Sequence, residues 1–167
     1  MTAEFDITMT VKAMRDYRFY HKYTRFAGIM ELILGLFLIA FGIFTIGRTQ
    51  VSYTLVLIVI GSFFLIIMPL SMYFRAASTV KTNKRFKEPT HYVMSKDKMF
   101  LSMGEYSQDV SWDMIYKVKE TKTSILIYFS AFGANVLPKD QLGDQLDTVK
   151  AIIKESMDPY KLYFKKQ

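Results

Sequence analysis

Residues capable of catalytic or metal-binding chemistry are few in this chain. Its two histidines, His21 and His91, lie far apart in the sequence, and it has no cysteine for thiolate or disulfide chemistry. We find no phosphate-binding glycine loop, no paired metal-ligand motif and no nucleophile motif. We therefore predict no catalytic residue, no metal and no cofactor, and we interpret each histidine as a surface or interfacial residue. A serine, histidine and acid brought together by folding stays open as an alternative.

Two apolar stretches dominate the first half of the chain, at residues 26–46 and 51–74, joined by a short polar turn. A bilayer core about 30 Å thick is crossed by roughly 20 apolar helical residues. Both stretches reach that length, and an isolated apolar run in lipid is helical because it must satisfy its own backbone hydrogen bonds. The sequence predicts a helical hairpin that crosses a membrane twice. The alternative is a pair of buried core helices in a soluble protein.

Glu31 is the single charged residue inside these stretches. An acid inside a span marks a functional site by default. Glu31 lies only about 7 Å along the helix from the start of the span, within reach of the headgroups. We therefore favour pairing with Arg75 or Arg25, or snorkelling, over ion transport.

Three glycines recur every seven residues in the first stretch, at Gly28, Gly35 and Gly42. This spacing places them on one helix face. Glycine lets a neighbouring helix approach closely, so we predict that this face packs on the second stretch. The alternative is that glycine is simply common in membrane helices. In the second stretch, Pro69 predicts a bend.

Basic residues cluster on both flanks of the hairpin, whereas the turn carries only Arg48. By the positive-inside rule, both termini are expected to face the cytoplasm, with the hairpin crossing the membrane between them. The clusters also suit anionic lipid headgroups. Binding to nucleic acid is not favoured. The basic residues cluster at the ends of the predicted spans, where the positive-inside rule already accounts for them. The candidate lipid or partner contacts are Arg18, Lys22, Arg25, Arg75, Lys84, Arg85 and Lys139.

Short alternating segments make up most of the remaining chain. Phe5, Ile7 and Met9 alternate, which predicts a strand that must pair with a sheet elsewhere. Thr10 is placed to cap a helix that runs into the first span. After Pro89, tight turns separate further strands, which favours an antiparallel meander. These strands are predicted at residues 91–95, 99–103, 106–112, 115–121, 125–129 and 134–137.

The chain ends in a different pattern, with an apolar stripe through Leu142, Leu146, Val149 and Ile153. This stripe predicts one helix that ends before Pro159 and covers the sheet. The fold class is α+β, a transmembrane hairpin plus a small antiparallel meander or partial barrel capped by a C-terminal helix. The predicted divisions are a strand and juxtamembrane helix at 1–25, the hairpin at 26–75, a basic connector at 76–87 and a cytoplasmic domain at 88–167.

Three features of the predicted domain have a physical interpretation. Trp112 ends a strand as a core residue, with ligand stacking as the alternative, and Asp113 is placed to cap the next turn. Lys139 is interpreted as a solvated charge, with phosphate or acid contact as the alternative. The tail at residues 160–167 mixes aromatics with lysines. It either lies on the inner leaflet or packs on the sheet.

The layout resembles the YcxB-like membrane proteins of bacteria. The resemblance rests on the N-terminal strand, the helix containing Asp16 and Tyr17, the hairpin, and two short motifs at residues 110–121 and 136–139. It implies a multi-pass protein of the bacterial plasma membrane with a cytoplasmic pleckstrin-homology-like domain and no established activity. It supplies no catalytic residues.

Two functions follow from these observations. The first is a non-enzymatic interaction or regulatory module held at the inner leaflet, which binds lipid headgroups, a protein or a peptide. The alternative is a small transport or channel component built on the hairpin. Two spans enclose no pore, so this alternative requires a homo-oligomer. No residue evidence supports an enzyme at the membrane surface.

Overall fold

The computed structural model describes residues 1–131 and 133–164. Phe132, between the strands predicted at 125–129 and 134–137, and the last three residues of the predicted tail lie outside the described residues. The chain divides into two compact units, which are treated separately below. Unit 1 combines Met1–Met14 with Val80–Gln167, and unit 2 is Arg15–Thr79. Helices and antiparallel sheets are both present, which confirms the predicted α+β class.

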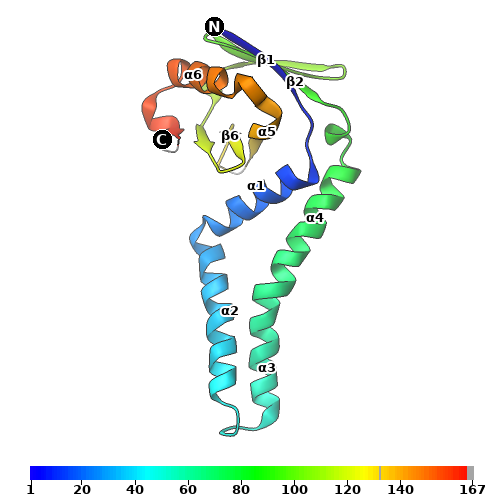
Figure 1. Cartoon of the computed structure of the whole chain (residues 1–167), viewed down its shortest axis with the longest axis vertical. Helices are drawn as coiled ribbons and strands as arrows, with labels where there is room; N and C mark the ends of the chain where they lie inside the picture. The colour runs from blue at the N-terminus through cyan, green and yellow to red at the C-terminus, as the bar shows by residue number, and fades with distance from the viewer. Residues whose placement is uncertain (132, 165–167) are drawn as a thin grey trace. The chain divides into compact units, whose positions relative to one another are not determined.

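Unit 2 contains two apolar helical runs that lie side by side (Figure 1). They run over Phe26–Phe44 and Val51–Thr82, and both are long and apolar enough to cross a membrane. Large apolar side chains along both runs are exposed, among them Phe37 at 60% and Val59 at 65%. The elements are α1 (Val11–Tyr23, shared with unit 1), α2 (Phe26–Phe44), α3 (Val51–Ser62), a π-helical turn η1 (Phe63–Ile67) and α4 (Met68–Thr82, whose end belongs to unit 1).

Glycines set the close approach of these helices. A Cβ on Gly35 would lie 2.9 Å from Leu65 Cγ, and a Cβ on Gly61 would lie 2.8 Å from the Gly35 carbonyl oxygen. A Cβ on Gly42 would lie 2.9 Å from Ile58 Cγ1. Gly35 and Gly42 therefore face the second helical run.

Gly28 does not face that run, which corrects the prediction that all three spaced glycines pack on it. A Cβ there would overlap the Lys22 carbonyl oxygen. The predicted continuous helix from Val11 into the first span is also wrong. The chain turns after Tyr23, and Arg25 is extended at φ −93° and ψ 146° before α2 begins. Gly28 leaves room for this corner because it carries no side chain.

The irregular turn in the second run lies just before Pro69. A proline ring crowds the carbonyl four residues earlier and supplies no N–H. That earlier residue is Leu65, in the middle of η1. The predicted bend is therefore associated with a π-helical turn, a recognised cause of helix distortion.

Unit 1 contains two four-stranded sheets. The first has the order β1-β2-β3-β4 and is antiparallel throughout, so β1 finds the partner that the sequence required. The second has the order β7-β6-β5-β8, in which only the β5–β8 pair is parallel. The strands are β1 (Thr2–Ile7), β2 (Thr90–Ser95), β3 (Lys98–Met103), β4 (Tyr106–Ser111), β5 (Lys117–Glu120), β6 (Ser124–Tyr128), β7 (Ala134–Pro138) and β8 (Leu162–Tyr163).

The predicted C-terminal helix is interrupted. It consists of α5 (Lys139–Leu142), a 3₁₀ turn η4 (Gly143–Gln145) and α6 (Leu146–Ser156). The break lies at Gly143, whose φ of +50° is incompatible with a continuous helix. Other 3₁₀ turns are η2 (Lys84–Phe86), η3 (Trp112–Met114) and η5 (Pro159–Lys161).

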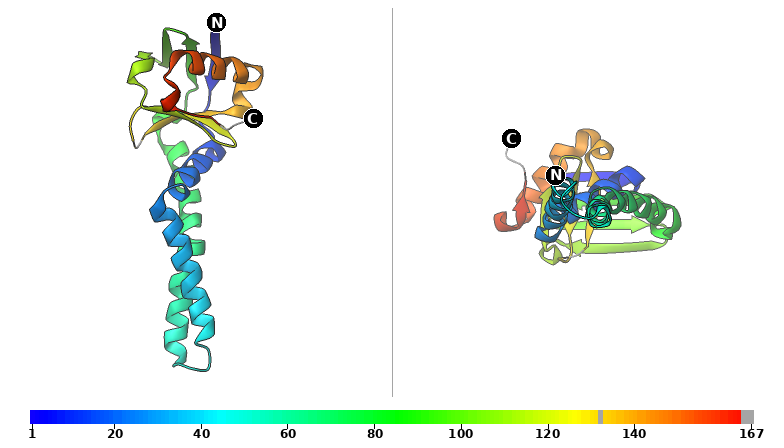
Figure 2. Two further views of the ribbon diagram at one scale, coloured as in Figure 1. Left: turned by 90° about the vertical axis from the view of Figure 1, so that its left-hand side faces the viewer. Right: turned by 90° about the horizontal axis from the view of Figure 1, so that it is seen from below.

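The core of unit 1 lies between the two sheets and α6 (Figure 2). Alternation along each strand sends every second side chain inward. In β1, for example, Ala3, Phe5 and Ile7 are buried. Leu162 and Phe164 pack against the same core, so the described part of the tail packs on the sheet.

Candidate functional sites

Four of the predicted lipid contacts lie in unit 2. Arg18, Lys22 and Arg25 come from α1 and the corner after it, and Arg75 comes from α4; we call these four the basic collar. Arg18 Nη2 donates to Thr79 Oγ1 at 2.8 Å, and the Thr79 hydroxyl donates to the Arg75 carbonyl at 2.7 Å. Within unit 2, this chain of hydrogen bonds ties the end of α1 to α4.

Glu31 is paired with Lys22. Lys22 Nζ lies 2.6 Å from Glu31 Oε2, and the two side chains are 22% and 31% exposed. The predicted partners, Arg75 and Arg25, are wrong, because the corner after Tyr23 brings Lys22 back toward the second turn of α2. Glu31 therefore has an oppositely charged partner from its own unit.

The remaining predicted contacts lie in unit 1. Lys84 and Arg85 form the turn η2, where the Asn83 side chain accepts a hydrogen bond from the Arg85 backbone at 3.0 Å. Lys139 begins α5. The predicted contact residues are thus divided between two units and do not form one described site.

Lys139 takes part in a buried ion cluster that the sequence did not predict. Its Nζ lies 2.6 Å from Glu120 Oε1, and Lys150 Nζ lies 2.7 Å from the same oxygen. The Glu120 side chain is 6% exposed, and those of the lysines are 21% and 20% exposed. The interpretation of Lys139 as a solvated charge is therefore wrong. We call Glu120, Lys139 and Lys150 the ion triad.

The ion triad alters the acidity of its carboxyl group. Burial by itself would raise the pKa of Glu120 because it disfavours the charged form. Hydrogen bonds and the charges of Lys139 and Lys150 outweigh burial and lower the pKa from 4.5 to about 2. One signal in the sequence pointed to this site. The alternation of β5 places Glu120 on the same inward face as Val118, where an acid requires a partner.

A shallow pocket of about 200 Å³ lies beside Trp112 in unit 1. Trp112 is 5% exposed, and its Nε1 donates to the Ser95 carbonyl at 3.0 Å, so it is a core residue as predicted. Asp113 lies within η3 and makes no side-chain cap there, which corrects its predicted role. The pocket is lined by Trp112, Asp113, Glu155, Ser156, Met157, Asp158, Pro159 and Lys161.

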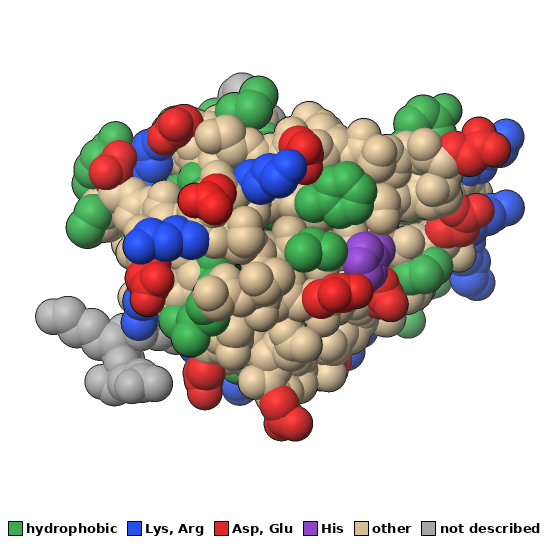
Figure 3. Space-filling model, turned by 90° about the horizontal axis from the view of Figure 1, so that it is seen from above, with side chains coloured by type: hydrophobic (Ala, Val, Ile, Leu, Met, Phe, Trp, Pro, Cys, Tyr) green, Lys and Arg blue, Asp and Glu red, His purple; other side chains and the backbone are tan. Residues whose placement is uncertain are grey.

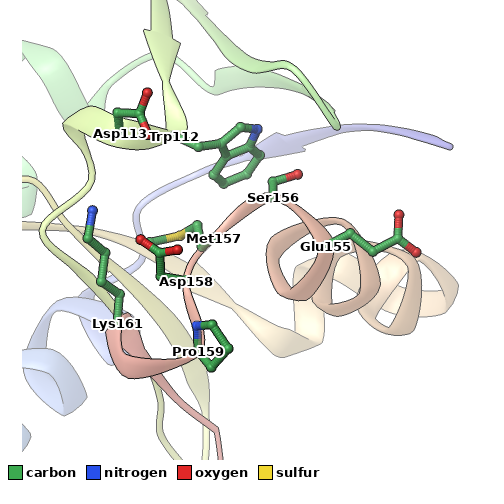
Figure 4. Close-up of a pocket in the computed structure, with 8 residues that line it drawn as sticks. All are labelled: Trp112, Asp113, Glu155, Ser156, Met157, Asp158, Pro159 and Lys161. Atoms are coloured by element: carbon green, nitrogen blue, oxygen red, sulfur yellow. The ribbon is translucent and has the colours of Figure 1, made fainter.

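The charged groups of this pocket do not converge. Figure 4 shows the carboxylates of Asp113, Glu155 and Asp158 pointing in different directions. Lys161 extends along the side that faces η3. The arrangement therefore presents no focused set of polar groups for a small ligand.

His91 lies on the outer face of the first sheet between two acids. Its Nδ1 is 2.8 Å from Asp6 Oδ1, and its Nε2 is 3.5 Å from Glu4 Oε1. Ser102 stands opposite His91 in the β2–β3 ladder, which makes a row of acid, histidine and serine across three strands. The imidazole nitrogen that a serine nucleophile needs is directed at Glu4 instead.

Charges of both signs are mixed over the face of unit 1 that Figure 3 shows. This mixture shows no continuous basic patch of the kind that binds nucleic acid. Among residues 1–131 and 133–164, no group of three or more histidine and carboxylate side chains could hold a metal ion.

Comparison with known proteins gives one match. The family model described as YcxB-like protein matches residues 95–153, from the end of β2 into α6. The matched segment contains Trp112 and the whole ion triad. No curated protein and no solved structure matches the chain. The chain is therefore similar to the YcxB-like family over residues 95–153, the segment that contains the motifs at 110–121 and 136–139.

Proposed function

We propose that the chain is a membrane-anchored, non-enzymatic interaction protein of the bacterial plasma membrane. The two helical runs of unit 2 cross the bilayer, and unit 1, a pleckstrin-homology-like domain, presents a binding surface at the cytoplasmic side. The exposed apolar side chains along α2 and α3 support this proposal, since contiguous apolar surface of this extent needs lipid or a partner to cover it.

One observation carries the proposed topology. Strand β1 precedes the hairpin, and β2 follows it, yet the two are paired over their full length from Thr2 with Ser95 to Ile7 with Thr90. Paired strands must lie on the same side of a bilayer. The chain between them therefore crosses the membrane an even number of times, as a two-span hairpin does.

The basic collar supports a cytoplasmic location for that side. Arg18, Lys22, Arg25 and Arg75 all lie at the ends of the spans that join unit 1, and positive residues favour the cytoplasmic side. Each Lys or Arg close to an anionic surface contributes about 1 kcal/mol of binding. The charge of Lys22 is paired with Glu31, so the three arginines supply most of the attraction to anionic lipid.

The transport alternative is not favoured by any of these contacts. It depended on Glu31 as an intramembrane acid available to ions. Glu31 is paired with Lys22 near one end of its helix. That pairing gives Glu31 a role in fixing the corner between α1 and α2.

The proposal is tested by cysteine accessibility, because the natural chain has no cysteine. Gln50→Cys places a thiol in the turn of the hairpin, and Tyr106→Cys places one in β4 of unit 1. A membrane-impermeant maleimide added to intact spheroplasts is expected to label Gln50→Cys at once. It should label Tyr106→Cys only after the membrane is opened.

Labelling of Tyr106→Cys in sealed spheroplasts would contradict the cytoplasmic orientation. Recovery of the unmodified chain in the soluble fraction without detergent would contradict membrane anchoring itself. The interaction role is tested separately by purification from a detergent extract. Recovery of no partner, together with equal binding to neutral and anionic vesicles, would refute it.

A further inference from the structure

The two sheets of unit 1 have outer strands β1, β4, β7 and β8, and three of these are protected. Glutamine side chains cover the free edge of β1: Gln145 Nε2 donates to the Glu4 carbonyl at 3.0 Å, and Gln141 Nε2 donates to the Thr8 carbonyl at 2.9 Å. The same two side chains accept hydrogen bonds from the Glu4 and Thr8 N–H groups. Strand β7 ends in Pro138 and has three of its five residues buried, and β8 has only two residues. Proteins blunt strand edges in these ways because an open edge pairs with other chains.

Strand β4 lacks such protection in the part of the chain that the structure describes. It has six residues, five of them exposed, and contains neither proline nor lysine. Its register with β3 runs from Lys98 with Ser111 to Met103 with Tyr106 without a bulge. The free side of β4 is therefore a regular row of backbone groups.

The turn between β3 and β4 determines which of these groups face outward. Gly104 and Glu105 form a two-residue loop, and Gly104 has a φ of +56°, as in the tight turns that join such strands. The residues flanking this loop form a hydrogen-bonded pair, and bonded and non-bonded pairs alternate from there. Ser107, Asp109 and Ser111 fall on non-bonded pairs, so their N–H and C=O groups point away from β3. Among the described residues, none bonds to these outward groups.

We infer that β4 pairs antiparallel with β4 of a second copy of this chain, which joins two four-stranded sheets into one continuous sheet. The outward backbone groups select an extended strand as the occupant, because a strand presents donors and acceptors at the same spacing. This chain can supply that strand itself, since an antiparallel pair of identical strands has two-fold symmetry.

Charge selects the register of this pair, since outward groups must face outward groups. Pairing Asp109 with itself places two carboxylates opposite each other, and pairing Ser107 with itself places Asp109 opposite Glu105. Like charges directly opposite destabilise a sheet. Pairing Asp109 with Ser111 leaves less of the strand overlapped. Pairing Ser107 with Asp109 avoids all three faults, makes about four backbone hydrogen bonds, and places the two-fold axis at Gln108.

The same register covers the exposed aromatic side chain of the strand. Tyr106 is 80% exposed, and it would stand opposite Val110 of the second copy. An aromatic residue opposite a β-branched one stabilises an antiparallel pair. The carboxylate of Asp109 is already paired with Lys98 at 2.8 Å, so its charge does not keep the second copy away.

The first test is disulfide cross-linking of the full chain in mild detergent. The natural chain has no cysteine, so each variant carries a single thiol. In the inferred register the two Gln108 Cα atoms lie about 4.5 Å apart, within reach of a disulfide, so Gln108→Cys should form a linked dimer under mild oxidation. Ser107→Cys is the matched control. Its two Cα atoms would lie about 8 Å apart, beyond the roughly 7 Å limit, and it should form about tenfold less linked dimer.

The second test removes an outward N–H group. Ser107→Pro leaves the bonded pairs of β3 and β4 in place, because the N–H of Ser107 points away from β3. By symmetry the dimer loses two hydrogen bonds of about 1 kcal/mol each, so its dissociation constant, measured by light scattering, should rise about 30-fold. Ser107→Ala keeps the N–H group and should leave the constant unchanged. The emission of Trp112 verifies that each variant is folded.

A chain that stays monomeric at every concentration overturns the inference, as does equal cross-linking of Gln108→Cys and Ser107→Cys. A dimer that Ser107→Pro leaves intact uses another surface and also overturns it. Cross-linking of Gln108→Cys to a different protein in cells would assign the edge to a foreign strand instead of a second copy. None of these outcomes bears on membrane anchoring, which the labelling of Gln50→Cys and Tyr106→Cys tests separately.

Discussion

The ion triad makes the free energy of unfolding of unit 1 depend on pH, and Glu120→Gln should remove this dependence. The folded-state pKa of Glu120 is lowered from 4.5 to about 2 by Lys139 and Lys150, which outweigh its burial. A lowered pKa means that the carboxylate contributes stability above about pH 4.5, and that this contribution is lost as the pH falls toward 2. The shift corresponds to at most roughly 3 kcal/mol of unfolding free energy.

The measured effect should be smaller than this limit. Both lysine side chains remain about one-fifth exposed, so solvent screens part of the attraction. We expect Glu120→Gln to lower the free energy of unfolding of unit 1 by about 1–3 kcal/mol at pH 7, and by almost nothing near pH 2. Replacing Lys139 and Lys150 together by methionine should cost more, about 3–5 kcal/mol, because it leaves a buried carboxylate without a cation.

The assay is urea unfolding of the full chain in detergent, followed by tryptophan emission. Trp112 is the single tryptophan and lies in the core of unit 1, so its emission reports that unit alone. Asp109→Asn is the matched control, since the pair between Asp109 and Lys98 is more than half exposed and should contribute less than about 1 kcal/mol. A Glu120→Gln variant with the same slope of stability against pH between 2 and 5 as the natural chain would refute the reasoning.

Three further predictions concern unit 2 and are checked by the melting temperature of the chain in detergent. Gly61→Ala places a Cβ against a backbone oxygen that cannot move aside, so it should destabilise the hairpin by about 1–3 kcal/mol. Gly42→Ala should cost less, because its Cβ meets a flexible side chain. Equal costs would contradict this. Thr54→Val removes a buried hydroxyl contact of 3.2 Å near the turn and should cost about 1 kcal/mol; no change would show that the contact is not formed. Lys22→Met should destabilise the chain, and adding Glu31→Gln should restore most of the loss; a double variant as unstable as the single one would contradict the pairing.

Local signals in the sequence predicted most of the elements. Thr10 was predicted to cap a helix, and its Oγ1 accepts from the Ala13 N–H at 3.1 Å. The strands from β2 to β7 lie within two residues of their predicted ranges. Burial alternates in β5, whereas all five residues of β6 are buried. Strand β8 was missed, since it has two residues and forms only by parallel pairing with a strand distant in sequence. The division into two sheets was also missed, because it depends on which strands pair and not on any local pattern.

Side-chain partners were harder to predict than elements. The partner of Glu31 depends on the corner between α1 and α2, and a helix drawn straight through that corner points Lys22 elsewhere. The partners of Lys139 depend on the register of β5 and on where α6 crosses the sheet. Such contacts join residues far apart in the chain, so no local pattern encodes them. The inward position of Glu120 was the one available clue.

The pairing of β1 with β2 has a consequence for how the protein is made. β1 leaves the ribosome first, but its partner is synthesised only after both apolar helices. Until then Ala3, Phe5 and Ile7, which end up buried, have no sheet to join. Under the proposed topology, a chain in which only one helix entered the bilayer would leave β1 and β2 in different compartments. Completion of the sheet would then act as a checkpoint for biogenesis, and a half-inserted chain would display an unpaired strand to proteolytic quality control.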